Sequence, residues 1–422
     1  MAGGQSQLVA YGPQDAFITG DSKISFFQAV YKRHTNFAME NIQQTVNGTA
    51  SSGNRISITL ARNGDLIGQM YMKLYLKNAS GVVDAKITMD GDAGAWLAER
   101  AVADIELSIG GSRIDKHYQR WWRMYAELYL DESKKANYGK MTSFSGPSTM
   151  AANQKLAVYL PFLFAFNRFP GLYLPLIALQ AHEVRLDIDL SREYDTYFTQ
   201  SPEVWGNYVY LDDAERARFV ARPHQYLFEQ VQHTGLDSMA TQIRLSYNHP
   251  VKFVAWSINN GKTDASNLWN LTTTTSAKLT TNVDACSAGM SLSLLGAPVL
   301  DSATNVLFTE ENYGPLSANC ASFKLVLNGQ DRFKEQDGKF FNQVQPYWHM
   351  PGNPMPGIYM YSFAIKGDEY QPTGACNFSR IDNAQTQYGT VAGVSSYVQD
   401  MYAVSWNMLR IQNGMGGVMF AN

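Results

Sequence analysis

Short stretches of alternating apolar and polar residues dominate this chain. Residues 70–76 read Met-Tyr-Met-Lys-Leu-Tyr-Leu, and residues 184–190 read Val-Arg-Leu-Asp-Ile-Asp-Leu. Alternation with a period of two places one face of a strand in a core and the other toward solvent, as in antiparallel sandwiches. Helical periodicity is sparse, and its clearest case is residues 118–130, which contain Trp121 and Trp122. The pattern predicts an all-β protein with short helices in its loops.

Three segments depart from this pattern. Residues 1–40 are predicted to form an N-terminal arm, in which the apolar residues of 26–31 fall at helical spacing. This spacing predicts a short amphipathic helix that packs either on its own barrel or against a neighbour. Residues 131–155 are polar and are predicted to be a long exposed loop. Residues 259–322 are rich in Ser, Thr and Asn, and we expect them to form a surface tower, because so long a loop is usually functional or mobile.

Residues 214–232 separate two series of strands. The first half of this segment is charged, and Arg222 precedes Pro223, a position that disfavours helical geometry. We therefore predict a first β domain over residues 41–220 and a second over residues 221–422.

The two series of strands look like copies of one plan. The first shared landmark is a strand, a turn and a strand, over residues 58–76 in one half and 243–258 in the other. The third is a Pro-Gly turn followed by an apolar segment, residues 170–179 against residues 356–365. Such patterns recur by chance in all-β proteins, but three landmarks in the same order indicate a duplication.

The second landmark is an alternating strand that ends in a two-residue turn. Residues 105–111 read Ile-Glu-Leu-Ser-Ile-Gly-Gly, and residues 323–329 read Phe-Lys-Leu-Val-Leu-Asn-Gly. Two-residue hairpin turns need positive φ, which Gly and Asn adopt most easily. Gly111 and Gly329 are therefore predicted to be turn glycines.

Composition narrows the class of protein. A length of 422 residues fits two large β domains. Charged residues make up 17% and aromatic residues 13%, and protein interfaces are likewise poor in charge and rich in aromatic residues. A net charge of −3 implies no strong attraction to nucleic acid.

Compartment signals are few. The three cysteines form no CxxC pair, which favours a reducing compartment. We see no signal peptide, and the longest apolar run, residues 156–166, is too short to span a bilayer.

The search for chemistry yields no catalytic, cofactor-binding or metal-binding residue. His182 and Glu183 begin like a zinc-protease motif, but Leu186 stands where that motif needs histidine. Residues 90–94 suggest a calcium loop and lack its remaining ligands. Of four glycosylation sequons, the most accessible candidate is Asn270, which matters only if the chain meets a glycosylating machinery.

Several stretches resemble the major capsid proteins of nucleocytoplasmic large DNA viruses, and the phycodnavirus-like branch most of all. The matching stretches are residues 8–15, 26–37, 109–116, 176–183, 327–333, 361–365 and 371–383, the last reading Gln-Pro-Thr-Gly-Ala-Cys-Asn-Phe-Ser-Arg-Ile-Asp-Asn. The resemblance weakens over residues 131–155 and 260–320.

The resemblance implies a double jelly roll, two consecutive eight-stranded antiparallel barrels. It also implies a homotrimer with a pseudo-hexagonal outline that tiles an icosahedral shell in the virion. Minor capsid and penton proteins and an inner viral membrane would lie nearby, with no direct contact to nucleic acid, and assembly would take place in the host cytoplasm.

Two alternative functions stay open at this point. A carbohydrate-binding β-sandwich would bind glycans as an isolated chain and need no trimer. An enzyme on a jelly-roll scaffold would need clustered His and carboxylate residues. Jelly rolls support many functions, so the fold alone does not decide between them.

Overall fold

The computed structural model describes residues 3–76, 78–79, 82–83, 96–142, 157–236, 242–259, 320–354, 357–389 and 398–420. The chain divides into two compact units, Met1–Phe37 and Ala38–Asn422, and each is described by itself. The tower expected over residues 259–322 lies almost entirely outside the described residues, as does Asn270.

The first unit contains two short helices, α1 (Gly3–Val9) and α2 (Pro13–Thr19). Helix α2 starts with Pro13, and the backbone N–H of Gly12 donates to the Asp15 carboxylate at 2.8 Å, both common at helix N-termini. The helix expected over residues 26–31 is wrong, because this segment is irregular. Phe27 is 100% exposed, so no packing stabilises a helix here.

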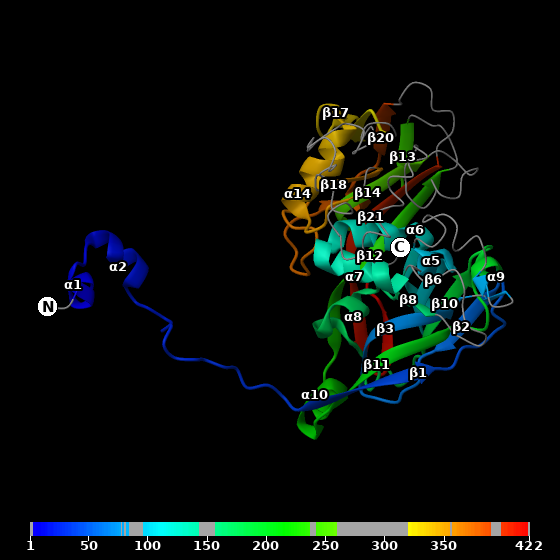
Figure 1. The fold of residues 1–422 in the computed structure, drawn as a ribbon, viewed down its shortest axis with the longest axis horizontal. Helices are drawn as coiled ribbons and strands as arrows, with labels where there is room; N and C mark the ends of the chain where they lie inside the picture. Colours follow the sequence, from blue (N-terminus) through cyan, green and yellow to red (C-terminus); the bar gives the residue numbers. More distant parts are fainter. Residues whose placement is uncertain are drawn as a thin grey trace. The chain divides into compact units, whose positions relative to one another are not determined.

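The second unit begins with two antiparallel sheets, which we call the first barrel (Figure 1). The order of the first sheet is β1, β11, β3, β8, with β9 also paired to β3, and that of the second is β2, β10, β6, β7. Their bounds are β1 (Phe37–Gln44), β2 (Arg55–Thr59), β3 (Leu66–Tyr75), β6 (Val102–Ile109), β7 (Ser112–Tyr118), β8 (Ala157–Pro161), β9 (Leu174–Pro175), β10 (Val184–Leu190) and β11 (Glu203–Leu211). A small hairpin, β4 (Asn78–Ala79) and β5 (Val82–Val83), stands apart.

The later part of the chain repeats this arrangement as a second barrel. Its sheets have the orders β12, β21, β14, β18 and β13, β20, β15, β16, and the additional strands β17, β19 and β22 pair with β15, β14 and β21. The bounds are β12 (His224–Leu236), β13 (Gln242–Leu245), β14 (Pro250–Asn259), β15 (Ser322–Leu327), β16 (Gln330–Asp331), β17 (Gln336–Asp337), β18 (Ile358–Ser362), β19 (Cys376–Asn377), β20 (Ala384–Gly389), β21 (Val398–Gln412) and β22 (Met415–Val418). Each strand of the first barrel has a counterpart at the same place in the second, which adds β17 and β22. The fold is a double jelly roll, as the sequence predicts.

The first two landmarks correspond between the barrels, but the third does not. Strand β18 pairs with residues 253–257 of β14, as β8 pairs with residues 71–75 of β3. Residues 170–179 instead hold β9, which pairs with the start of β3, as β19 does with β14. Both segments follow a Pro-Gly dipeptide in the sequence and pair with the equivalent central strand of their barrel, β3 or β14, so the sequence suggested a correspondence that is wrong.

The hairpin turns have the geometry that their sequences favour. Gly110 and Gly111 have φ of 58° and 80°, and Asn328 and Gly329 have φ of 50° and 80°. The residues that flank each two-residue turn pair with each other across the hairpin, Ile109 with Ser112 and Leu327 with Gln330.

Short helices fill the loops. They are α5 (Leu97–Arg100), α6 (Gln119–Tyr129), α7 (Glu132–Thr142), α8 (Ala165–Arg168), η1 (Pro170–Leu172), α9 (Tyr194–Tyr197), α10 (Asp213–Ala221), η2 (Phe340–Val344), α14 (Gln345–His349) and η3 (Phe378–Arg380). Helix α6 confirms the prediction for residues 118–130, and α10 ends just before Arg222 and Pro223.

The prediction of an exposed loop over residues 131–155 is wrong for residues 132–142, which form α7. Lys135 forms an ion pair with Glu127, and the Tyr138 hydroxyl donates to Glu99 at 2.7 Å, so both polar side chains are buried. The polar sequence of this segment suggested exposure, because the residues that pair with Lys135 and Tyr138 lie on other elements and cannot be recognised from the segment itself.

Candidate functional site: the seam between the two barrels

The apolar core of the first barrel extends onto one sheet of the second barrel, which also has a core of its own, and we call the region where the two barrels meet the seam. Along β14, Val254 and Trp256 point into the second barrel's own core, whereas Phe253 and Ala255 belong to the core that contains the first barrel. Because successive side chains on a strand point to opposite faces, this sheet is buried on both faces. Figure 1 shows α6 and α7 between the sheets of the two barrels.

Aromatic rings from α6 cover the outer face of this sheet. The rings of Tyr129 and Phe253 are 5.9 Å apart, and those of Trp121 and Tyr402 are 5.5 Å apart. Such ring pairs lie within the range of favourable aromatic contacts. Helix α6 therefore joins the barrels as well as capping the first one.

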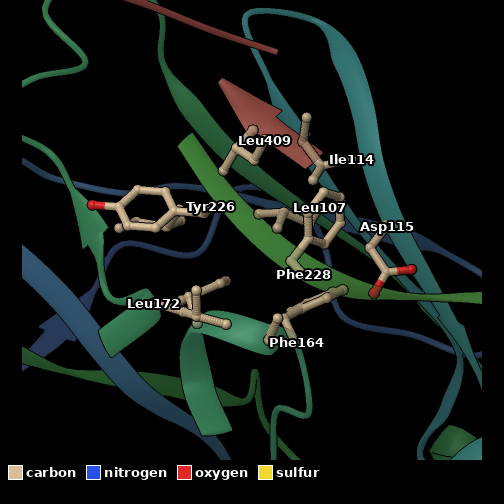
Figure 2. A pocket seen from close by; sticks show the side chains of 11 residues that line it. Leu107, Ile114, Asp115, Phe164, Leu172, Tyr226, Phe228 and Leu409 are labelled. Carbon is tan, nitrogen blue, oxygen red and sulfur yellow. The ribbon is translucent and has the colours of Figure 1, made fainter. Parts of the chain in front are cut away.

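A small cavity lies within the seam (Figure 2). Leu107, Ile114 and Phe164 line it from the first barrel, and Phe228 and Leu409 line it from the second. Its open space is about 20 Å³, enough for one water molecule and too small for an organic ligand. The seam is thus packed like a protein interior.

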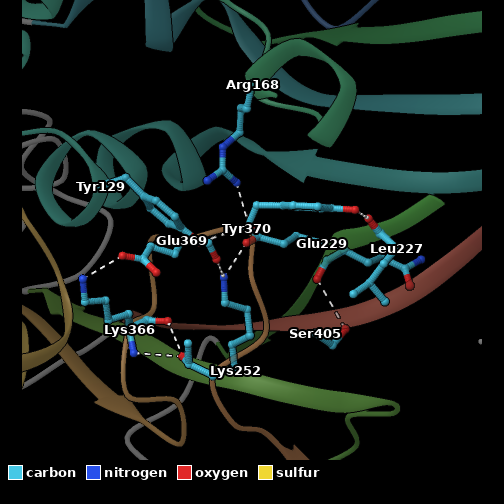
Figure 3. A network of polar contacts seen from close by, with 11 residues as sticks. Tyr129, Arg168, Leu227, Glu229, Lys252, Lys366, Glu369, Tyr370 and Ser405 are labelled. Carbon is cyan, nitrogen blue, oxygen red and sulfur yellow. Dashed lines mark hydrogen bonds and ion pairs between the residues drawn. The ribbon is translucent and has the colours of Figure 1, made fainter. Parts of the chain in front are cut away.

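A buried carboxylate, Glu229 on β12, holds two cations in the seam (Figure 3). Arg168 Nη1 lies 2.7 Å from one carboxylate oxygen, and Lys252 Nζ forms a close ion pair with the other. The Tyr129 hydroxyl also donates to Glu229 at 3.3 Å. Arg168 and Tyr129 come from the first barrel, and Glu229 and Lys252 come from the second, so the network ties the two together.

Burial and charge act in opposite directions on these groups. Burial alone would raise the pKa of Glu229, but the charges of Arg168 and Lys252 lower it below its ordinary value. The pKa of Lys252 is lowered because burial outweighs the attraction of Glu229. For Arg168 the attraction of Glu229 outweighs burial, and its pKa is raised. The seam therefore favours an ionised Glu229 and an ionised Arg168 at neutral pH.

A second ion network lies around Asp400 on β21. Arg120 of α6 forms an ion pair with one oxygen, and His233 Nε2 lies 2.9 Å from the other. Burial opposes ionisation, but the hydrogen bond with His233 and the charge of Arg120 lower the pKa of Asp400 below its ordinary value.

Backbone contacts complete the seam beside α7. The Gly352 N–H donates to the Leu128 carbonyl at 3.0 Å, and Lys135 Nζ donates to the Asn353 carbonyl at 3.0 Å. A Cβ atom at position 352 would lie 2.2 Å from the Glu127 carbonyl oxygen, so only glycine fits there.

The residues singled out from sequence lie elsewhere. Gly111 and Gly329 occupy open turns, with no atom within 4 Å of an added Cβ, so only their positive φ constrains them. His182 is a structural residue whose Nδ1 accepts a hydrogen bond from the Gly416 N–H at 3.2 Å. The sequence analysis did not identify Arg168, Glu229 or Lys252. The lysine at position 252, within the otherwise apolar strand segment 251–256, could have indicated a buried ion pair.

Within the described ranges, no three His, Cys, Asp or Glu side chains are grouped to hold a metal ion. Nor is any helix in that part of the chain long and apolar enough to cross a membrane. Cys320 is buried and free, and burial raises the pKa of its thiol to about 12.

Comparisons with known proteins agree with one another. Residues 25–212 match the major capsid protein N-terminus family, and residues 215–417 match the large eukaryotic DNA virus major capsid protein family. The major capsid protein of Paramecium bursaria Chlorella virus 1 is 40% identical over 470 aligned positions, which cover 100% of both chains. That of Phaeocystis pouchetii virus is 34% identical, again with 100% of both chains covered.

Solved structures give the same fold. A chain of the PBCV-1 virus capsid aligns with a TM-score of 0.75 and 35% identity, covering 94% of this chain and 100% of that one. The Faustovirus major capsid protein aligns with a TM-score of 0.67 at 11% identity, over 95% of this chain and 94% of that one, a likeness of fold alone.

Proposed function

Because this chain belongs to the family of large eukaryotic DNA virus major capsid proteins, we propose that three copies close into one pseudo-hexagonal capsomer. The chain is a structural component of the virion capsid, which it builds with copies of itself, and it is not an enzyme. The proposal concerns the unit from which that shell is assembled.

The observation that carries the proposal is the repeated strand order of the two barrels and the seam that joins them. Six similar barrels from three chains fill a hexagonal footprint, while each chain keeps one contact set under threefold symmetry. A hexagonal unit can then tile the icosahedral shell of a large double-stranded DNA virus.

The wider assembly follows from the same proposal. Minor capsid and penton proteins and an inner viral membrane lie near the capsomers, and the net charge of −3 supports no direct role in binding nucleic acid. Synthesis and assembly take place in the host cytoplasm. In this proposal residues 1–40 are the arm, which runs into β1 at its end, and residues 41–220 and 221–422 are the first and second jelly rolls.

Light scattering of the purified full chain tests the capsomer. We expect a mass of about three times 47.1 kDa and, by negative-stain electron microscopy, a hexagonal outline. A stable monomer at assembly concentrations would contradict the proposal and leave the fold unaffected. Asn270 stays a glycosylation candidate, which mass spectrometry of its peptide from virions tests.

A further inference from the structure

The outer face of the sheet β1, β11, β3, β8 is the first barrel's counterpart of the seam face. Four aromatic side chains lie partly exposed on this face, Tyr71, Tyr75, Tyr159 and Trp205, beside a hydrogen bond from Asn207 to Gln69 and an ion pair of 3.6 Å between Lys73 and Glu203. On β1, Met39 is 50% exposed and lies on the same face as Asn41, whose amide donates to the Tyr71 hydroxyl at 3.3 Å.

Strand register shows which positions correspond. Tyr71 pairs with Trp205 on one side and Pro161 on the other, just as Phe253 pairs with Val404 and Ser362. Counting along the strands from there, the equivalent pairs are Tyr71 with Phe253, Lys73 with Ala255, Tyr159 with Met360 and Trp205 with Val404. In the second barrel these positions are fully buried in the core that contains the first barrel, where Tyr129 of α6 contacts Phe253.

The element that does the covering also has a counterpart. Helix α6 lies between β7 and β8 of the first barrel, and the helical segment η2–α14 lies between β16 and β18 of the second. This segment exposes two large aromatic side chains, Tyr347 at 83% and Trp348 at 61%. Exposed Ile365 adjoins it, since its carbonyl lies 2.8 Å from His349 Nδ1.

Each half of the seam thus has a counterpart whose surface stays at least partly exposed within the described part of the chain. We propose that α14 of one copy packs on the outer face of β1, β11, β3 and β8 of a second copy, as α6 packs on β12, β21, β14 and β18 within the chain. This inference rests on the proposed trimer and names its contact surfaces. Aromatic side chains on both surfaces suit a protein interface. The contact is head-to-tail, because one copy offers its helix and the other its sheet, and such contacts form closed rings when their rotation closes.

Two variants separate the surfaces. Trp348→Asp places a charge on the helix, and Met39→Asp places one on the sheet face, both at positions at least half exposed in the isolated chain. Val220→Asp is the matched control, since Val220 is also 50% exposed but lies on α10, outside both surfaces. Light scattering is expected to give single chains for the first two variants and a trimer for the control, with thermal unfolding monitored by circular dichroism to show that all three are folded.

Mixing the two variants tests the direction of the contact. A Trp348→Asp chain keeps an intact sheet face, and a Met39→Asp chain keeps an intact helix, so an equimolar mixture can form one junction. We expect a heterodimer of about twice 47.1 kDa that does not close. Folded trimers from both variants overturn this inference and leave the proposed capsomer intact, whereas a monomeric unaltered chain overturns the capsomer itself.

Discussion

Replacing Glu229 by glutamine removes the negative charge that pairs with Arg168 and Lys252 in the buried cluster of the seam. The side-chain volume is kept, so the change isolates the charge. The side chain of Lys252 is 1% exposed and that of Arg168 is 11% exposed, which leaves both cations poorly hydrated. Removing one partner of a buried ion pair typically costs about 3–5 kcal/mol, because the remaining charge stays buried. We expect Glu229→Gln to lower the free energy of unfolding by about this amount.

Lys252→Met is the matched comparison. The lowered pKa of Lys252 means that its surroundings disfavour the ammonium even with Glu229 present. Methionine keeps most of the apolar stem, and Glu229 keeps its ion pair with Arg168. Because Glu229 stays paired with Arg168, the substitution leaves no buried charge uncompensated, so we expect a change within about 1 kcal/mol.

Equilibrium urea unfolding of the full chain, followed by tryptophan fluorescence, measures both variants. Trp121 and Trp406 lie at the seam, where their emission reports its opening. Protein concentration must be matched, because assembly couples to stability. Equal losses for the two variants, or no loss for Glu229→Gln, would show that charge pairing does not hold the seam.

Three further predictions concern turns, acidity and the long insertion. Gly111→Val and Gly329→Val should each block folding, because a β-branched residue disfavours the φ of +80°, whereas Gly111→Asn should fold; soluble trimers from both valine variants would contradict this. The lowered pKa values of Glu229 and Asp400 stabilise the fold above the ordinary carboxylate pKa, and this contribution is lost as the pH falls through the lowered values. The urea concentration at the unfolding midpoint should therefore decrease once the pH is lowered below about 4, and it should decrease less steeply in Asp400→Asn. An equally steep decrease in both proteins would contradict this prediction. Deleting most of residues 262–318 should leave a folded trimer by light scattering, and loss of folding would mean that this segment packs in the core or at an interface.

Periodicity predicted the strands of the first barrel well, because its sheets have one covered face and one half-exposed face. It failed where tertiary partners decide the structure. Helix α7 has polar residues that are buried only because Glu99 and Glu127 lie opposite them. The arm helix at residues 26–31 had the right spacing and no packing partner within its unit. Spacing reports a tendency, and contacts distant in sequence decide whether it is realised.

The seam was harder to predict, although the sequence contains a sign of it. Residues 70–75 of β3 alternate, whereas residues 253–256 of β14 read Phe-Val-Ala-Trp without alternation. A strand buried on both faces loses its alternation. This difference between equivalent strands indicates that the second barrel's sheet is covered on both sides. It does not reveal what covers it, since the charges that meet there come from β12, β14 and α8.

The equivalent sheet faces of the two barrels differ in residue composition because they are covered at different times. Phe253 and Ala255 are buried as soon as the chain folds, so apolar residues there never face water. Tyr71 and Lys73 occupy the same places on a face that stays half-exposed until another molecule arrives. Tyrosine and the Lys73–Glu203 pair keep such a face soluble, while the aromatic rings retain the area that a partner can bury. One duplicated surface therefore has two compositions, one suited to a permanent contact within the chain and one to a contact made during assembly.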